Sequence, residues 1–126
     1  MTNEITKILV IDDEKMIRDL AEKILKKASY NVLLAEDGEN GIEIFNKNMD
    51  SIKLLLIDLS MAGISGIETL QKIRAIVEDI PCIISSGNNY DQNDIPSNLN
   101  HDIYFLQKPY HAKQLSNMVN EILSTC

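Results

Sequence analysis

Acidic, hydroxyl and basic side chains follow the short apolar runs of this chain, each at the point where a run ends. Close carboxylates repel one another, so they stay ionised together only beside a counter-charge. A divalent cation such as Mg²⁺ supplies that charge, because it prefers oxygen ligands and completes its octahedron with water or a phosphate oxygen. A lysine and a hydroxyl beside it could hold the oxygens of a phosphoryl group. The residues concerned are Asp12, Asp13, Asp58, Ser86 and Lys108.

Asp58 is the strongest candidate for the reacting group. A carboxylate can act as the nucleophile in phosphoryl transfer and form an acyl phosphate. Asp58 follows the apolar run at 54–57, and the expected sheet order places this run centrally. The alternative is an ordinary turn residue after a strand. We favour the acceptor role because acids and a lysine follow other runs of the same sheet.

The elements that must position these residues are five short apolar runs, which alternate with segments of helical periodicity. The runs are apolar on both faces, which is typical of parallel strands covered by crossover helices. We therefore predict one α/β domain over residues 1–126, with a doubly wound, five-stranded parallel sheet. Ligands of such folds bind at the carboxyl ends of the strands. The predicted strands lie at 8–11, 32–35, 54–57, 82–84 and 104–106.

The segment between Gly87 and His101 departs from the alternation. It contains five asparagines, and its bulky apolar residues are Tyr90, Ile95 and Leu99. Pro96 also removes a backbone donor there, and asparagine favours turns over helix interiors. We predict that the fourth helix, expected in this segment, is short or irregular.

The composition excludes several classes of function. With a net charge of -7, the chain repels nucleic acid and anionic membranes, whose phosphates attract lysine and arginine. No apolar run approaches the length that crosses a bilayer, so we expect no membrane insertion. Cys82 and Cys126 are too few for a disulfide framework or a zinc site. A cytoplasmic location with reduced thiols is the expectation.

In their order and spacing, these motifs resemble the response-regulator receiver family over essentially the whole chain. Ala62 stands where the family pattern has proline, so we expect a more mobile loop after Asp58. The residues at 84–87 and 105–110 also resemble receivers attached to hybrid sensor kinases. The motifs that carry the resemblance are Asp12-Asp13, the segment from Asp58 to Gly66, Ser86-Gly87 and Lys108-Pro109.

The resemblance implies a set of magnesium ligands. Asp13 and Asp58 would bind Mg²⁺ through their carboxylates, together with the backbone carbonyl of Ser60. Asp12 would act mainly through water. Taken alone, the acids at 12–14 could simply favour the start of a helix, because its N-terminus attracts negative charge.

It also implies residues that hold the phosphoryl group and report its arrival. Ser86 would move toward the phosphoryl group, and Lys108 would pair with it. Phe105 matches the aromatic switch position, although core packing is an equally weighted role for it. We predict that the side chains of Ser60 and Asn88 tune dephosphorylation by gating water.

The implied function is a phosphoacceptor receiver domain of a two-component phosphorelay. A histidine kinase or histidine phosphotransfer protein would donate to Asp58, and a partner would read the resulting switch. The chain would not be an enzyme beyond its own phosphorylation and slow autodephosphorylation. One alternative is a hydrolase like the haloacid-dehalogenase phosphatases, but these carry a second acid two residues after the nucleophile on the first strand, whereas Asp12 and Asp13 are adjacent. The other is a degenerate receiver that only contacts proteins, against which the acidic set and Lys108 argue.

Overall fold

The computed structural model describes residues 6–61, 63–87 and 95–124. Its strands form one five-stranded parallel sheet in the order β2-β1-β3-β4-β5. The strands are β1 (Lys7–Ile11), β2 (Asn31–Ala35), β3 (Ile52–Asp58), β4 (Cys82–Ser86) and β5 (Ile103–Gln107). The α-helices are α1 (Lys15–Lys27), α2 (Gly38–Asn48), α3 (Gly66–Arg74) and α4 (Ala112–Ser124). The predicted doubly wound α/β sheet is confirmed.

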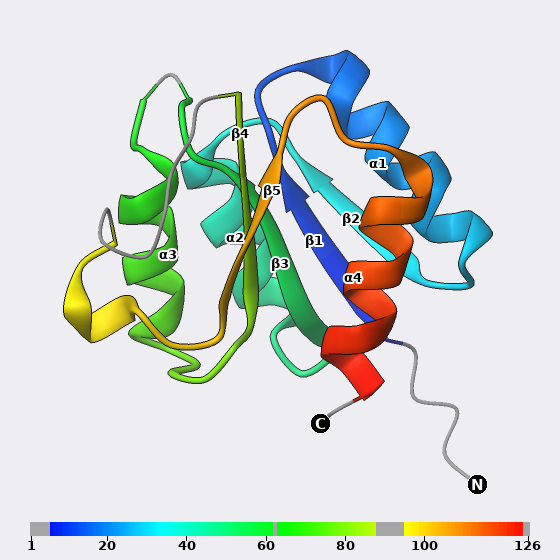
Figure 1. The fold of residues 1–126 in the computed structure, drawn as a ribbon. Helices are drawn as coiled ribbons and strands as arrows, with labels where there is room; N and C mark the ends of the chain where they lie inside the picture. Colours follow the sequence, from blue (N-terminus) through cyan, green and yellow to red (C-terminus); the bar gives the residue numbers. More distant parts are fainter. Residues whose placement is uncertain (1–5, 62, 88–94, 125–126) are drawn as a thin grey trace, which may run out of the picture.

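Two apolar cores lie on opposite faces of the sheet, because successive side chains of a strand point to opposite sides. On β1, Ile8 and Val10 face the core under α1 and α4, whereas Leu9 and Ile11 face the core under α2 and α3. Figure 1 shows the two pairs of helices on either side of the sheet. Since β1 and β3 are covered on both faces, their sequences are continuous apolar runs.

The helix α3 begins at a capping box formed by Ser65 and Glu68. The Ser65 hydroxyl accepts a hydrogen bond from the Glu68 backbone at 3.1 Å, and the Glu68 carboxylate accepts one from the Ser65 backbone at 3.2 Å. These two bonds satisfy donors that a helix start leaves unpaired. Apolar residues continue at helical spacing as far as Val77, but α3 ends at Arg74.

Arg74 is a buried cation that donates mainly to main-chain carbonyl oxygens, and its Nη1 also lies 3.5 Å from Nε2 of His101. Its Nη2 donates to the carbonyls of Ile80 at 2.9 Å and Asp102 at 3.2 Å, and its Nη1 donates to that of Leu99 at 2.9 Å. The end of α3 is thereby joined to the segments that precede β4 and β5. The guanidinium supplies enough donors for all these bonds, which allows it to be buried.

The region predicted to hold an irregular fourth helix is described from residue 95 onward. There the chain forms the short 3-10 helix η2 (Ser97–Leu99), which agrees with the prediction for that part. Ala62 and residues 88–94 lie outside the described residues, so the expectation of a mobile loop at Ala62 stays untested. Among the helices of the described ranges, none combines the length and the apolar character needed to cross a bilayer.

Candidate functional site

Asp12 lies directly after β1 and is held by hydrogen bonds on three sides. Its backbone N–H donates to the carbonyl of Ala35 at 3.1 Å. Its carboxylate accepts from the backbone of Glu14 at 2.9 Å, and its carbonyl accepts from Nη1 of Arg18 at 2.9 Å. The residue is only 2% exposed, so its carboxylate has a fixed position under the surface.

Asp58 is the last residue of the central strand β3 and is 5% exposed. The backbone of Ser60 donates to its carboxylate at 3.3 Å, and the next residue, Leu59, donates to the carbonyl of Ser85 on β4 at 2.9 Å. A Cβ atom at Gly66 would lie 2.5 Å from the carbonyl oxygen of Asp58 and 2.9 Å from Cα of Leu59. Glycine therefore lets α3 begin directly against the end of β3.

Lys108 follows β5 and extends its ammonium between the acidic side chains. Its backbone N–H donates to the carbonyl of Ser86 at 2.8 Å, which fixes the end of β5 to the end of β4. Its Nζ lies 2.8 Å from Oδ2 of Asp12 and 3.4 Å from Oδ2 of Asp58. Oε1 of Glu14 lies 3.5 Å from the same ammonium. The side chains of Lys108, Asp12 and Asp58 are nearly buried, so their charges interact with little screening by water, whereas the side chain of Glu14 is 63% exposed.

The pKa values follow from this arrangement. Burial and then the charge of Asp12 raise the pKa of Asp58, and the lowering effects of Lys108 and the Ser60 backbone do not compensate. For Lys108, burial alone would lower the pKa, but the hydrogen bond to Asp12 and the two carboxylate charges outweigh it and raise the pKa. Burial raises the pKa of Tyr110 to about 12, and the charge of Asp12 adds to this effect. The site favours additional positive charge.

Three carboxylates of the site lie close enough together to bind a cation. Asp12, Glu14 and Asp58 each offer an oxygen, and these oxygens lie within 4.8 Å of one another. An all-oxygen donor set of this kind suits Mg²⁺. Asp13, which the receiver resemblance names as a ligand, is exposed and is not a member of this group. Its role as a ligand therefore stays a prediction.

The structure adds residues that the sequence analysis did not single out. Glu14 was considered only as part of the acidic start of a helix, and it caps α1 without a side-chain cap hydrogen bond. Arg18 lies one turn further along and holds the Asp12 carbonyl. Tyr110 is buried beside the site, and its position directly after the Lys108-Pro109 pair was the available signal.

The remaining predicted residues lie around this centre, but their roles are untested. Ser86 is the buried last residue of β4. Ser60 is exposed, and it is the backbone N–H of Ser60 that contacts the Asp58 carboxylate. Phe105 is half-buried and packs against the core under α2 and α3, which accords with its core role without testing the switch. Asn88 lies outside the described residues.

The sequence matches the model of a protein family described as the response regulator receiver domain, over residues 8–120. Among individual relatives, it is 34% identical over 109 residues to YrkP of Bacillus subtilis (strain 168), described as an uncharacterized transcriptional regulatory protein. That match covers 86% of this chain and 46% of the relative. The chain therefore spans less than half the length of that protein.

Solved structures with the same fold include receiver domains. The receiver domain of the hybrid histidine kinase CckA is 32% identical, with a TM-score of 0.80 and coverage of 93% of this chain and 98% of that one. The response regulator TrrA from Thermotoga maritima, solved in complex with Mg²⁺-BeF, is 29% identical, with a TM-score of 0.81 and coverage of 94% and 99%. The likeness to CckA agrees with the resemblance to hybrid-kinase receivers found in the sequence.

Proposed function

Because the chain belongs to the response-regulator receiver family, we propose that it is the phosphoryl-accepting domain of a two-component phosphorelay. Asp58 receives the phosphoryl group from a histidine of a kinase or of a histidine phosphotransfer protein. The observation that carries this proposal is the buried Asp58 carboxylate at the end of the central strand, 3.4 Å from the Lys108 ammonium. A buried acid beside a cation and two further acids is costly for stability alone, which favours a functional reason for it.

In the proposed reaction, a carboxylate oxygen of Asp58 attacks the phosphorus of the phosphohistidine. The phosphorus–nitrogen bond breaks, its electron pair returns to the imidazole, and Asp58 becomes an acyl phosphate. Lys108 pairs with the oxygens of the phosphoryl group as the charge on them develops, because its ammonium already lies beside the attacking carboxylate. Asp12 holds Lys108 in place through its 2.8 Å contact.

We propose that this site uses Mg²⁺. Asp12 and Asp58 would hold the ion, together with the predicted Asp13 and the backbone carbonyl of Ser60, and the geometry adds Glu14 as a candidate. When bound, the ion supplies positive charge that offsets the acidic cluster and the incoming phosphoryl group. The three oxygen donors within 4.8 Å support this assignment, and TrrA is a related receiver solved with magnesium.

The proposal also includes a conformational change on phosphorylation and a partner protein that recognises it. A phosphoryl group brings roughly two negative charges and strong hydrogen-bond acceptors. We propose that Ser86 donates to it, that Phe105 repacks in response, and that a partner protein reads the change. The backbone bond from Lys108 to Ser86 supports such coupling, because it joins the two strand ends beside Asp58. The proposed location is the cytoplasm, where the phosphodonor kinase and the partner protein that reads the change would also lie.

Incubation with Mg²⁺ and acetyl phosphate, followed by intact mass measurement, tests the function. We expect a mass increase of one phosphoryl group, which is absent from Asp58→Asn and from a sample treated with EDTA. Asp50→Asn is the matched control, because Asp50 is an exposed aspartate outside the site. Continuous release of phosphate over many turnovers would instead favour the hydrolase, and neither phosphorylation nor magnesium binding would leave a degenerate receiver.

A further inference from the structure

The turn between β1 and α1 contains three consecutive acids, Asp12, Asp13 and Glu14. We call residues 12–14 the acidic turn. Inside it, the carboxylate of Asp12 accepts a hydrogen bond from the backbone N–H of Glu14 at 2.9 Å. Carboxylate oxygens of Asp12 and Glu14 also belong to the group that could hold a cation. The conformation of the acidic turn therefore decides which carboxylates can reach one ion.

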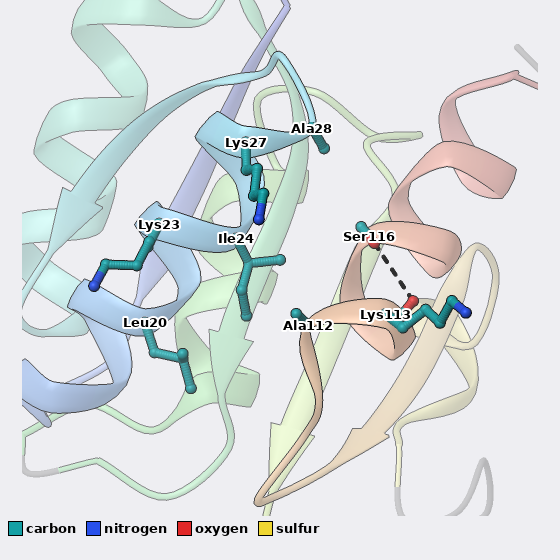
Figure 2. A pocket seen from close by; sticks show the side chains of 8 residues that line it. All are labelled: Leu20, Lys23, Ile24, Lys27, Ala28, Ala112, Lys113 and Ser116. Carbon is teal, nitrogen blue, oxygen red and sulfur yellow. Dashed lines mark hydrogen bonds between the residues drawn. The ribbon is translucent and has the colours of Figure 1, made fainter.

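The first turn of α1, which follows the acidic turn, is held only loosely by packing. The fully buried residues of this helix begin at Ala21, whereas Ile17 is partly buried and Met16 is 84% exposed. A hollow of about 660 Å³ between α1 and the start of α4 leaves part of one side of α1 without packing (Figure 2). Glu14 caps the helix without a side-chain hydrogen bond. The start of α1 therefore depends on polar contacts for its position.

Arg18 makes such contacts with both ends of the acidic turn. Its Nη1 donates to the carbonyl of Asp12 at 2.9 Å, and its backbone N–H donates to the carbonyl of Glu14 at 3.0 Å. The residue is half-buried. Among the described parts of the chain, no carboxylate oxygen lies within 4.0 Å of its guanidinium. Arg18 thus holds the turn by its backbone and does not pair directly with one of the acids.

We propose that Arg18 is a positioning residue of the magnesium site. Because a peptide unit is planar, a hydrogen bond that fixes the Asp12 carbonyl also fixes the N–H of Asp13 and the direction in which the acidic turn continues. This inference rests on the proposed use of Mg²⁺, and it adds a residue that touches neither the ion nor the phosphoryl group. Replacing a group that orients metal ligands from outside typically costs about 10–100-fold in metal affinity.

The charge of Arg18 and its positioning role predict opposite effects of Arg18→Met. If the guanidinium acted only through its charge, its removal would take a positive charge away from a cation site and strengthen Mg²⁺ binding. Since it holds the acidic turn, its removal should instead weaken Mg²⁺ binding, by about tenfold. Lys15→Met is the matched control, because it removes one positive charge from an exposed side chain of the same helix. This variant should bind Mg²⁺ at least as well as the parent.

Titration of the whole chain with MgCl₂, followed in amide NMR spectra, measures this affinity directly. Phosphorylation by acetyl phosphate gives a second readout. In Arg18→Met, the Mg²⁺ concentration that gives half the maximal rate should rise about tenfold. The rate at saturating Mg²⁺ should stay close to that of the parent, because Arg18 does not touch the reacting atoms. A merely structural role would lower the stability of the chain without separating these two quantities.

Hydrogen exchange in EDTA tests the acidic turn without metal. The amide of Glu14 donates to the Asp12 carboxylate, so its exchange rate, measured by NMR, reports the order of the turn. This amide should exchange faster in Arg18→Met than in the parent and in Lys15→Met. The amides of β4 should keep their protection in all three proteins, which shows that the change is confined to the turn.

Three results would overturn the inference. These are an unchanged exchange rate of the Glu14 amide in Arg18→Met, Mg²⁺ binding by Arg18→Met that equals or exceeds that of the parent, and an equal loss of Mg²⁺ affinity in Lys15→Met. A parent chain that binds no Mg²⁺ would refute the proposed metal site instead. The exchange rates alone would then decide whether Arg18 holds the acidic turn.

Discussion

Replacing Lys108 with methionine tests the electrostatic account of the site. Methionine keeps a long unbranched side chain and removes the cation that lies within 4.0 Å of both Asp12 and Asp58. At pH 7 the acidic side chains of the site then face one another without this counter-charge. We expect a lower free energy of unfolding, because a buried charge that has lost its partner destabilises the folded state.

The distances set the size of the effect. Coulomb's law with an effective dielectric constant of about 20 gives an attraction of about 6 kcal/mol for Lys108 with Asp12 at 2.8 Å. The same estimate gives about 5 kcal/mol for Lys108 with Asp58 at 3.4 Å. Much of this is offset because the lysine no longer has to be buried. Loss of one partner of a buried pair typically costs about 3–5 kcal/mol, and we expect about 3 kcal/mol here.

The pH dependence gives the prediction its direction. Lys108 is one of the groups that lower the pKa of Asp58, so its removal raises this pKa further. The folded variant then binds a proton more readily than the unfolded chain, and its stability rises as pH falls. The deficit relative to the parent should therefore be largest at pH 7 and should shrink toward pH 5. It should also be smaller when Asp58 is already asparagine.

Urea unfolding followed by circular dichroism measures this prediction. The parent, Lys108→Met, Asp58→Asn and the double variant are compared in EDTA from pH 5 to pH 8. Lys47→Met is the control for loss of an exposed lysine and should change stability by less than about 0.5 kcal/mol. A Lys108→Met deficit that is unchanged by pH and unchanged in the Asp58→Asn background would refute the reasoning, because the lysine would then act through packing alone.

Three further substitutions test other parts of the structure. Asp58→Asn should raise the free energy of unfolding at pH 7, because burial and Asp12 raise the pKa of this carboxyl in the folded state. The gain should disappear as pH falls through the pKa of Asp58 in the folded chain and then through its pKa in the unfolded chain. Urea titrations at several pH values measure it. Gly66→Ala should cost about 1–3 kcal/mol, since a Cβ there meets backbone atoms at 2.5 Å and 2.9 Å, and it should slow phosphorylation by acetyl phosphate. Arg74→Met should cost about 2–4 kcal/mol by leaving buried carbonyls unpaired, and hydrogen exchange should find the amides of β5 less protected while those of β1 keep their protection.

Much of the fold is predictable from the sequence, because buried parallel strands consist of continuous apolar runs. The run at 54–57 ends one residue before the end of β3, and the carboxyl ends of parallel strands meet at one edge of a sheet. The sequence alone therefore predicts that Asp12, Asp58 and Lys108 lie close together. In the structure, a carboxylate oxygen of each aspartate lies within 4.0 Å of the Lys108 ammonium.

Other features depend on side-chain direction, which the sequence does not specify. Asp13 and Glu14 are neighbours of the same type of charge, and only the turn into α1 decides which carboxylate approaches Lys108. The end of α3 is also hard to predict from the sequence, because apolar residues continue at helical spacing to Val77 while the helix stops at Arg74. The carbonyl partners of Arg74 belong to Ile80, Leu99 and Asp102, and no residue type at these positions indicates the contact.

The attachment made by Arg74 has a consequence for how this domain can diverge. Its guanidinium binds carbonyl oxygens of Ile80, Leu99 and Asp102, and every amino acid carries such an oxygen. These three bonds therefore do not depend on side-chain identity, although Ile80 and Leu99 are also buried in the core. Exposed positions of the segment before β5, such as Asn98 and Asn100, can therefore change, and with them the surface presented to other proteins, while the arginine on α3 keeps holding the backbone.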